Sequence, residues 1–181
     1  QTPMMIIERG NTKVCFCQET LAVTVEKDQT RWEWTDGFQP KLICKEGSFS
    51  FLDAVTITHE TYTMGVGIGI RSCFEGFEKD GVTYPYAFET LIWMEDTTEQ
   101  VYFEWVPLKE EGLQVEKVLW PGQMAFEEKK DSWYTLLTHQ QGILIPNDWE
   151  IPLSAIPFAG FFETAGGYMP WFGQVKDRQG Y

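Results

Sequence analysis

Apolar and polar residues alternate along most of this chain with a period of two, which is typical of strands that bury one face. Helical spacing is nearly absent, and the one short candidate, at 154–159, is disrupted by proline. The clearest alternating segments are 20–25, 30–34, 55–58, 88–93, 101–105, 115–119 and 133–137. This spacing predicts roughly a dozen short strands, and therefore an all-β fold, a two-sheet antiparallel β-sandwich.

Two Asp-Gly steps, at 36–37 and 80–81, predict where neighbouring strands are joined. Asp-Gly accepts the positive φ angles of tight hairpin turns. We therefore expect an antiparallel hairpin at each step.

Spaced glycines at 65, 67 and 69 invite comparison with a dinucleotide-binding loop. That fingerprint requires a helix after the glycines, and the pattern predicts none. Read as a strand, the segment places its glycines on one face and leaves a bare surface on which a bulky group can lie flat. We expect an aromatic ring from the facing sheet there rather than a ligand.

Length and charge narrow the class of protein further. The 181 residues suit one domain over 1–181, and a net charge of -13 argues against nucleic acid and anionic lipid as partners. No apolar run reaches the roughly 18 residues of a membrane span. Because the chain starts without Met and stops without a polar tail, we expect a segment of a longer protein, and its compartment stays open between cytoplasmic and secreted.

Candidate catalytic and metal-binding chemistry is sparse. The adjacent acidic pairs stand beside turns, as solvated surface charges do, and the serines lack a Gly-x-Ser-x-Gly elbow. His59 and His139 are isolated, and Cys15 with Cys17 is the single close pair of cysteines. We therefore expect no catalytic residue, no metal and no cofactor in this segment, and free thiols rather than disulfides, although four cysteines allow three pairings.

Aromatic residues make up 15% of the chain, more than a core of this size needs, and they mark three segments of its last third. These segments read Leu-Trp-Pro-Gly at 119–122, Gln-Gly-Ile-Leu-Ile-Pro at 141–146 and Gly-Gly-Tyr-Met-Pro-Trp-Phe-Gly-Gln at 166–174. The series resembles the N-terminal galactose-mutarotase-like supersandwich that precedes the catalytic (β/α) barrel in α-glycoside hydrolases of the α-N-acetylgalactosaminidase and endo-α-N-acetylgalactosaminidase type. The motifs that show the resemblance lie within about 100–181, whereas residues 1–99 agree only in their strand-rich character.

The resemblance implies a division of labour between sandwich and barrel. The barrel supplies the catalytic carboxylates, while the sandwich supports it and lends an aromatic loop to the sugar site. By that implication Trp171, with Tyr168 and Gln174, lies nearest the sugar. An indole stacks on the apolar face of a sugar ring, and amide or carboxylate groups bind its hydroxyls. Asp148 and Trp149 form a second cluster of the same chemical type.

Three functions are compatible with these observations, the third being a structural or adhesion domain without a ligand. The first is a non-catalytic glycoside hydrolase domain whose partners are a carbohydrate and a catalytic barrel of the same chain. The alternative is a free-standing carbohydrate-binding module, with Trp32 and Trp34, or Trp149 and Trp171, as its stacking platform. The last residues, 174–181, read as a hairpin begun and not finished, which favours the first function.

Overall fold

The structure is a computed structural model that describes residues 3–34, 37–122, 124–125, 133–137, 143–146, 173–176 and 179–180. These residues lie in two compact units, Gln1–Ala125 and Phe126–Tyr181. Nearly all the described secondary structure is strand, so the prediction of an all-β fold is confirmed. The helix candidate at 154–159 lies outside the described residues, and one domain over 1–181 stays a prediction.

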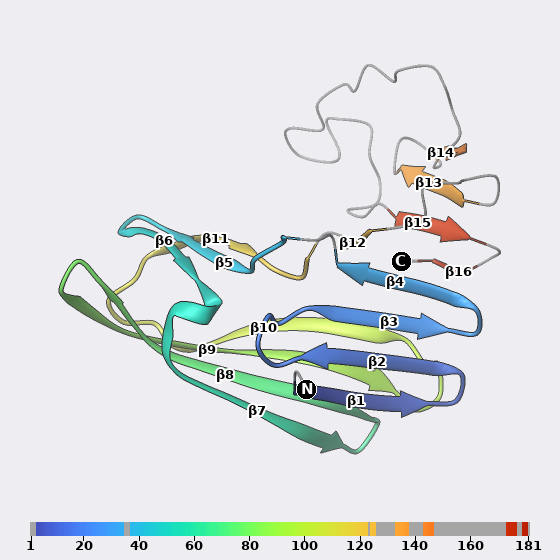
Figure 1. The fold of residues 1–181 in the computed structure, drawn as a ribbon, viewed down its shortest axis with the longest axis horizontal. Coiled ribbons are helices and arrows are strands. Elements are labelled where there is room, and N and C mark those ends of the chain that lie inside the picture. Colours follow the sequence, from blue (N-terminus) through green and yellow to red (C-terminus); the bar gives the residue numbers. More distant parts are fainter. Residues whose placement is uncertain are drawn as a thin grey trace. The chain divides into compact units, whose positions relative to one another are not determined.

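Three antiparallel sheets build the first unit (Figure 1). A long sheet runs in the order β10-β9-β8-β7, and two smaller sheets run β1-β2-β3-β4-β12 and β11-β5-β6. The long strands are β7 (Ala54–Met64), β8 (Gly67–Lys79), β9 (Val82–Glu95) and β10 (Val101–Lys109). The others are β1 (Met4–Arg9), β2 (Thr12–Cys17), β3 (Val23–Lys27), β4 (Thr30–Trp34), β5 (Lys41–Cys44), β6 (Gly47–Ser50), β11 (Val115–Leu119) and β12 (Met124–Ala125), with a short 3-10 helix η1 (Phe51–Asp53) after β6.

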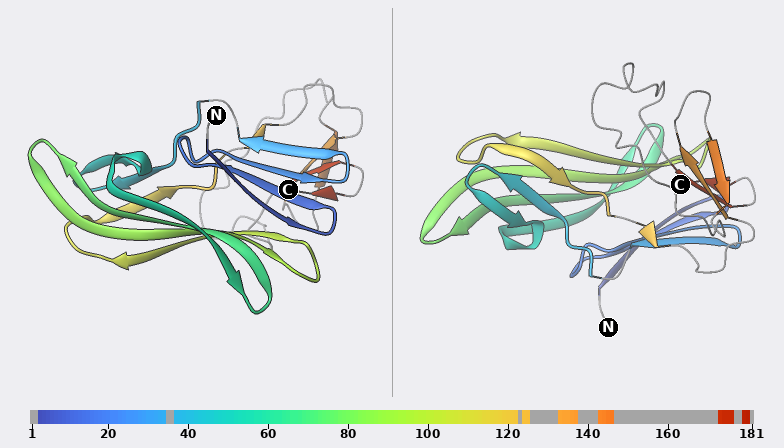
Figure 2. Two further views of the ribbon diagram at one scale, coloured as in Figure 1. Left: turned by 60° about the horizontal axis from the view of Figure 1, so that its bottom comes forward. Right: turned by 90° about the horizontal axis from the view of Figure 1, so that it is seen from above.

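An aromatic core joins the long sheet to β6 and η1, and the two smaller sheets lie along the same side of the long sheet (Figure 2). Phe88 stacks on Phe74 at 4.9 Å between ring centroids, and Phe51 of η1 packs against Phe88 at 4.6 Å. Phe49 of β6 meets Phe77 of β8 edge-on at 5.8 Å. Each of these five rings is at most 2% exposed, so the first unit is a sandwich closed by aromatic packing.

The two Asp-Gly steps behave differently. Asp80 and Gly81 have φ of 51° and 75° and join the paired strands β8 and β9, so the hairpin predicted there is confirmed. Gly37 also has a positive φ, of 78°, but β4 and β5 belong to different sheets. The hairpin predicted at 36–37 is therefore wrong, because a turn-forming step permits a reversal without deciding which strands pair.

The glycine run forms a hairpin of its own. Gly65 lies in the turn between β7 and β8, while Gly67 and Gly69 lie in β8. A Cβ added at Gly69 would lie 2.7 Å from Cβ of Trp93 and 2.9 Å from the carbonyl oxygen of Ile92, both on the neighbouring strand β9. The expected ring from the facing sheet is thus wrong, since the group that crowds this position comes from the same sheet.

The second unit contains one four-stranded antiparallel sheet, ordered β14-β13-β15-β16. Its strands are β13 (Trp133–Leu137), β14 (Ile143–Pro146), β15 (Gly173–Lys176) and β16 (Gln179–Gly180). The central strand β13 pairs with both β14 and β15, which fixes the ends of the long connection between those two strands.

Candidate functional site

The structure describes one of the five residues predicted to bind sugar, and that one by its backbone. Gln174 lies in β15, paired with Thr135 of β13. Asp148, Trp149, Tyr168 and Trp171 lie outside the described residues. The aromatic segment 166–174 therefore ends on a strand of the second unit, and its contact with sugar stays a prediction.

Trp32 and Trp34 do not form the exposed stacking platform that the alternative function requires. They are 4% and 6% exposed, and the strand that carries them buries every second residue. Arg31 and Glu33 occupy its outer face, where they pair with each other at 3.4 Å. The platform hypothesis is wrong for these two tryptophans, because the face opposite the charged residues is the core face.

The described thiols and carboxylates do not assemble a reactive centre. No group of three His, Cys, Asp or Glu side chains in the described part of the chain could hold a metal ion. All four cysteines are free, and burial, with smaller contributions from Glu46 and Glu116, raises the pKa of the Cys44 thiol to about 11. Such a thiol stays protonated near neutral pH and is a poor nucleophile. The described residues also contain no helix long and apolar enough to cross a membrane.

His59 forms a polar contact inside the sandwich. Its Nδ1 lies 2.7 Å from Oγ of Ser72 on the adjacent strand, and its ring lies 5.1 Å from that of Phe16. Burial lowers the pKa of His59, and a hydrogen bond with the backbone of Gln18 opposes this in part. Because Ser72 is only 1% exposed, substrate has no access to its hydroxyl. We assign the pair a structural role, because it links β7 and β8 beneath the smaller sheet that contains Phe16.

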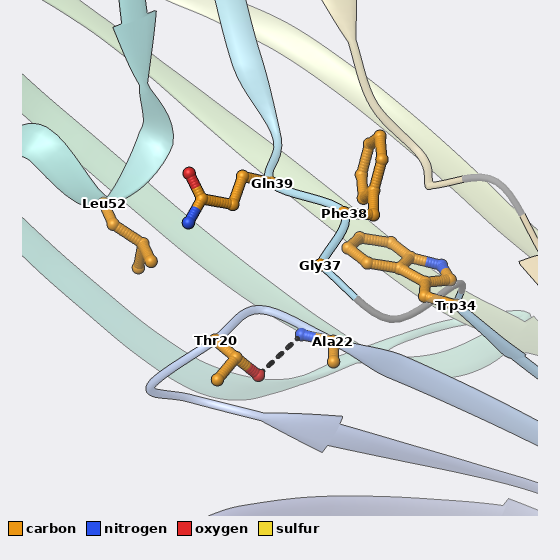
Figure 3. Close-up of a pocket in the computed structure, with 7 residues that line it drawn as sticks. All are labelled: Thr20, Ala22, Trp34, Gly37, Phe38, Gln39 and Leu52. Atoms are coloured by element: carbon orange, nitrogen blue, oxygen red, sulfur yellow. Dashed lines mark hydrogen bonds between the residues drawn. The ribbon is translucent and has the colours of Figure 1, made fainter.

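A pocket of about 300 Å³ opens beside the smaller sheets (Figure 3). Three segments far apart in the chain line it, namely the turn before β3, the segment that follows β4, and η1. The lining residues are Thr20, Ala22, Trp34, Gly37, Phe38, Gln39 and Leu52. Sequence reasoning missed this pocket, because no short motif records the meeting of three separate segments.

Local hydrogen bonds hold the walls of this pocket. In the turn before β3, the N–H of Cys17 donates to the carbonyl of Ala22 at 2.9 Å, and the N–H of Ala22 donates to Oγ1 of Thr20 at 3.3 Å. At η1, Ser50 caps the N–H of Leu52 at 3.3 Å. Both ends of the pocket are thus fixed by short-range contacts.

Aromatic packing fixes the third wall. Trp34 and Phe38 meet edge to face, with ring centroids 5.2 Å apart and planes at 86°. A Cβ at Gly122 would lie 2.7 Å from Cδ1 of Phe38, so the chain passes close behind these rings. Trp34, Phe38 and Gly122 therefore pack closely on this side of the pocket.

A second aromatic group covers the outer face of the long sheet. Tyr62, Gly69, Trp93 and Tyr102 are register neighbours across β7, β8, β9 and β10. Trp93 stacks on Tyr102 at 4.4 Å, and the guanidinium of Arg71 lies 5.1 Å from the centroid of Tyr62. These three rings are half-buried, and their contacts are with one another and with Arg71.

These features define the first unit as an antiparallel β-sandwich with an aromatic core. Proteins of this fold class have many functions, so the fold alone does not indicate one. Among solved structures, the chain is similar to the α-N-acetylgalactosaminidase NagBb from Bifidobacterium bifidum. Its GalNAc and Gal-NHAc-DNJ complexes each align at 43% identity, with a TM-score of 0.81, over 96% of this chain. The ligand-free structure aligns at the same identity, with a TM-score of 0.76.

The match covers only part of that enzyme. This chain spans 28% of NagBb in the two complexes and 27% in the ligand-free structure. No protein-family model matches the chain, and no curated protein matches it either. The predicted resemblance to the α-N-acetylgalactosaminidase type is confirmed, and the chain is homologous to a part of a glycoside hydrolase.

Proposed function

We propose that this chain is a non-catalytic β-sandwich of a glycoside hydrolase of the α-N-acetylgalactosaminidase type, which supports the catalytic region and helps to shape its sugar site. The observation that carries the proposal is 43% identity over 96% of this chain but only 28% of NagBb. In this proposal, residues 1–181 are one N-terminal domain of a longer chain that continues into a catalytic (β/α) barrel.

The described carboxylates are consistent with a supporting role. Glu99 accepts hydrogen bonds from the backbone N–H of Asn11 and the hydroxyl of Thr12, and Glu46 accepts one from the backbone N–H of Gln114. Each of these contacts joins segments more than 60 residues apart. These carboxylates hold the sandwich together rather than face a bond to be cleaved.

The proposal also assigns the loop before β15 to the rim of the sugar site. Trp171 would stack on the ring, with Tyr168 and Gln174 beside it, and Asp148 and Trp149 would form a second contact group. The pairing of Gln174 with Thr135 supports this assignment, because it anchors the end of the loop on a strand. NagBb was solved with GalNAc, and we propose an N-acetylated galactose unit as the sugar.

The test is Trp171→Ala in the longer protein, assayed on an aryl α-N-acetylgalactosaminide. We expect kcat/KM to fall by about tenfold or more while the melting temperature changes little, because a lost stacking contact is worth about one factor of ten. Trp171→Phe is the matched control and should recover most of the rate. An unchanged rate in Trp171→Ala contradicts the loop assignment.

A further inference from the structure

The pocket of Figure 3 has no role in the proposed function. We propose that it is a second carbohydrate site, which takes the ring of one neutral pyranose and works independently of the loop around Trp171. Sequence reasoning and the similarity to NagBb leave this site unassigned.

The size and charge of the pocket select this ligand class. A volume of about 300 Å³ lies at the small end of ligand sites, which suits a single sugar ring. None of the seven lining residues that the structure describes is charged; Thr35 and Asp36, between Trp34 and Gly37, lie outside the described residues. A ligand with a carboxylate would lose its hydration there without gaining a counter-ion from the described lining. The described lining therefore favours a neutral ligand over an anionic one.

The lining also matches the two sides of a pyranose. The half-buried ring of Phe38, the edge of Trp34 and the side chain of Leu52 form an apolar wall for the C–H face of a sugar. In Figure 3 the six-membered ring of Trp34 lies on the side of Gly37 and the other lining residues, and its nitrogen lies on the far side. This orientation presents carbon atoms rather than the N–H to the ligand.

Two polar side chains, those of Gln39 and Thr20, could form hydrogen bonds with the hydroxyls of a sugar. The exposed carboxamide of Gln39 offers both a donor and an acceptor on the side of the opening opposite Trp34 (Figure 3). The hydroxyl of Thr20 accepts a hydrogen bond from Ala22 and keeps its own proton to donate. An apolar wall with a few placed polar groups is the usual composition of a small-molecule site.

Preformed walls lower the cost of binding. The turn before β3 and the cap of η1 are held by the hydrogen bonds described above, and Leu21 anchors the turn with only 2% of its surface exposed. A site that is ordered before binding loses less conformational entropy when the ligand enters. A weak, saturable interaction with a single ring is therefore expected without a second domain.

The experiment titrates the 181-residue chain with GalNAc, galactose and glucuronate, followed by saturation-transfer NMR and calorimetry. We expect saturable binding of both neutral sugars with Kd of about 1–10 mM and no binding of glucuronate. Leu52→Trp, which fills the pocket, should abolish binding. Val55→Trp, at a 62% exposed position outside the pocket, is the matched control and should bind as the parent does.

Two further variants keep the test decisive. Gln39→Ala, at an exposed position, should weaken binding about two- to tenfold and leave the fold intact, as the loss of one hydrogen bond does. Trp171→Ala should leave sugar binding at the pocket unchanged. No binding at about 50 mM sugar, or binding lost in Trp171→Ala but retained in Leu52→Trp, overturns the second site. Either result leaves the proposed function standing, because that function does not require this pocket.

Discussion

The two faces of the long sheet carry similar side chains and use them differently. On the inner face, Phe74, Phe77 and Phe88 are at most 1% exposed and interlock with rings from the smaller sheets. On the outer face, Tyr62 and Trp93 are half-buried, with Tyr62 against Arg71 and Trp93 against Tyr102. An aromatic count therefore does not locate a working surface. The sheet face on which a ring lies, and the neighbours it has there, decide its role.

The polar contacts on the two faces differ in the same way. His59 and Ser72 meet among aromatic rings on the inner face. Arg71 pairs with Glu60 on the outer face, with 39% and 55% of the side chains exposed. A buried hydrogen bond is costly to break, whereas an exposed ion pair contributes little.

The largest expected effect comes from the inner face. Phe88→Ala should lower the free energy of unfolding by about 3–5 kcal/mol, because it empties the centre of a cluster that includes Phe51 and Phe74. Tyr102→Ala on the outer face is the comparison and should cost about 1 kcal/mol, the value of one exposed stacking contact. Urea unfolding followed by circular dichroism measures both. Equal losses would show that the two faces do not differ in packing.

An intermediate effect is expected for the buried polar pair. Ser72→Ala should cost about 1–3 kcal/mol, because the Nδ1 of half-buried His59 loses its partner, the hydroxyl of buried Ser72. Ser48, exposed on β6, offers a matched Ser→Ala control with little effect. If Ser72→Ala is as stable as the parent, the hydrogen bond carries no weight in the fold.

The same histidine predicts a pH dependence. Burial lowers the pKa of His59 in the folded state below its ordinary value of 6.5, so the unfolded chain binds the proton more readily. The stability associated with neutral His59 is therefore complete above pH 6.5 and is lost as pH falls through the folded pKa. His59→Gln should flatten the change in urea midpoint between about pH 7 and 5. A profile equally steep in the variant would assign that slope to other groups.

The smallest effect is expected on the outer face. Arg71→Gln and Glu60→Gln should each shift the urea midpoint only slightly, because the pair is exposed and its charges are screened by water and salt. The shift should shrink further in about 0.5 M salt. A large effect that persists at high salt would show that this face is more rigid than its exposure indicates.

The period-two pattern predicted the fold class because it follows from the geometry of a single strand. Pairing between strands depends on residues far apart, which is why the hairpin at 80–81 was predictable and the one at 36–37 was not. Its flanking strands pair instead with β12 and β11, whose residues lie about 70 or more positions along the chain. Local turn chemistry cannot report such distant partners.

The two candidate sites differ in the same way, because one is a contiguous segment and the other is assembled from separate segments. The loop around Trp171 could be predicted as a sugar contact because its residues are contiguous and resemble a known series, and that contact stays a prediction. The pocket could not be predicted, because Thr20, Phe38 and Leu52 come together only in the folded chain. Trp34 shows the limit of residue type as a guide, since a tryptophan expected on a surface contributes only its edge to the pocket wall.

The central claim is that this chain is a non-catalytic part of a glycoside hydrolase. The most direct test compares hydrolysis of an aryl α-N-acetylgalactosaminide by the purified 181-residue chain and by the longer protein that contains it. We predict turnover by the longer protein and none by the chain, even when circular dichroism shows that the chain is folded. Turnover by the chain that disappears on substitution of a single Glu or Asp would contradict the account.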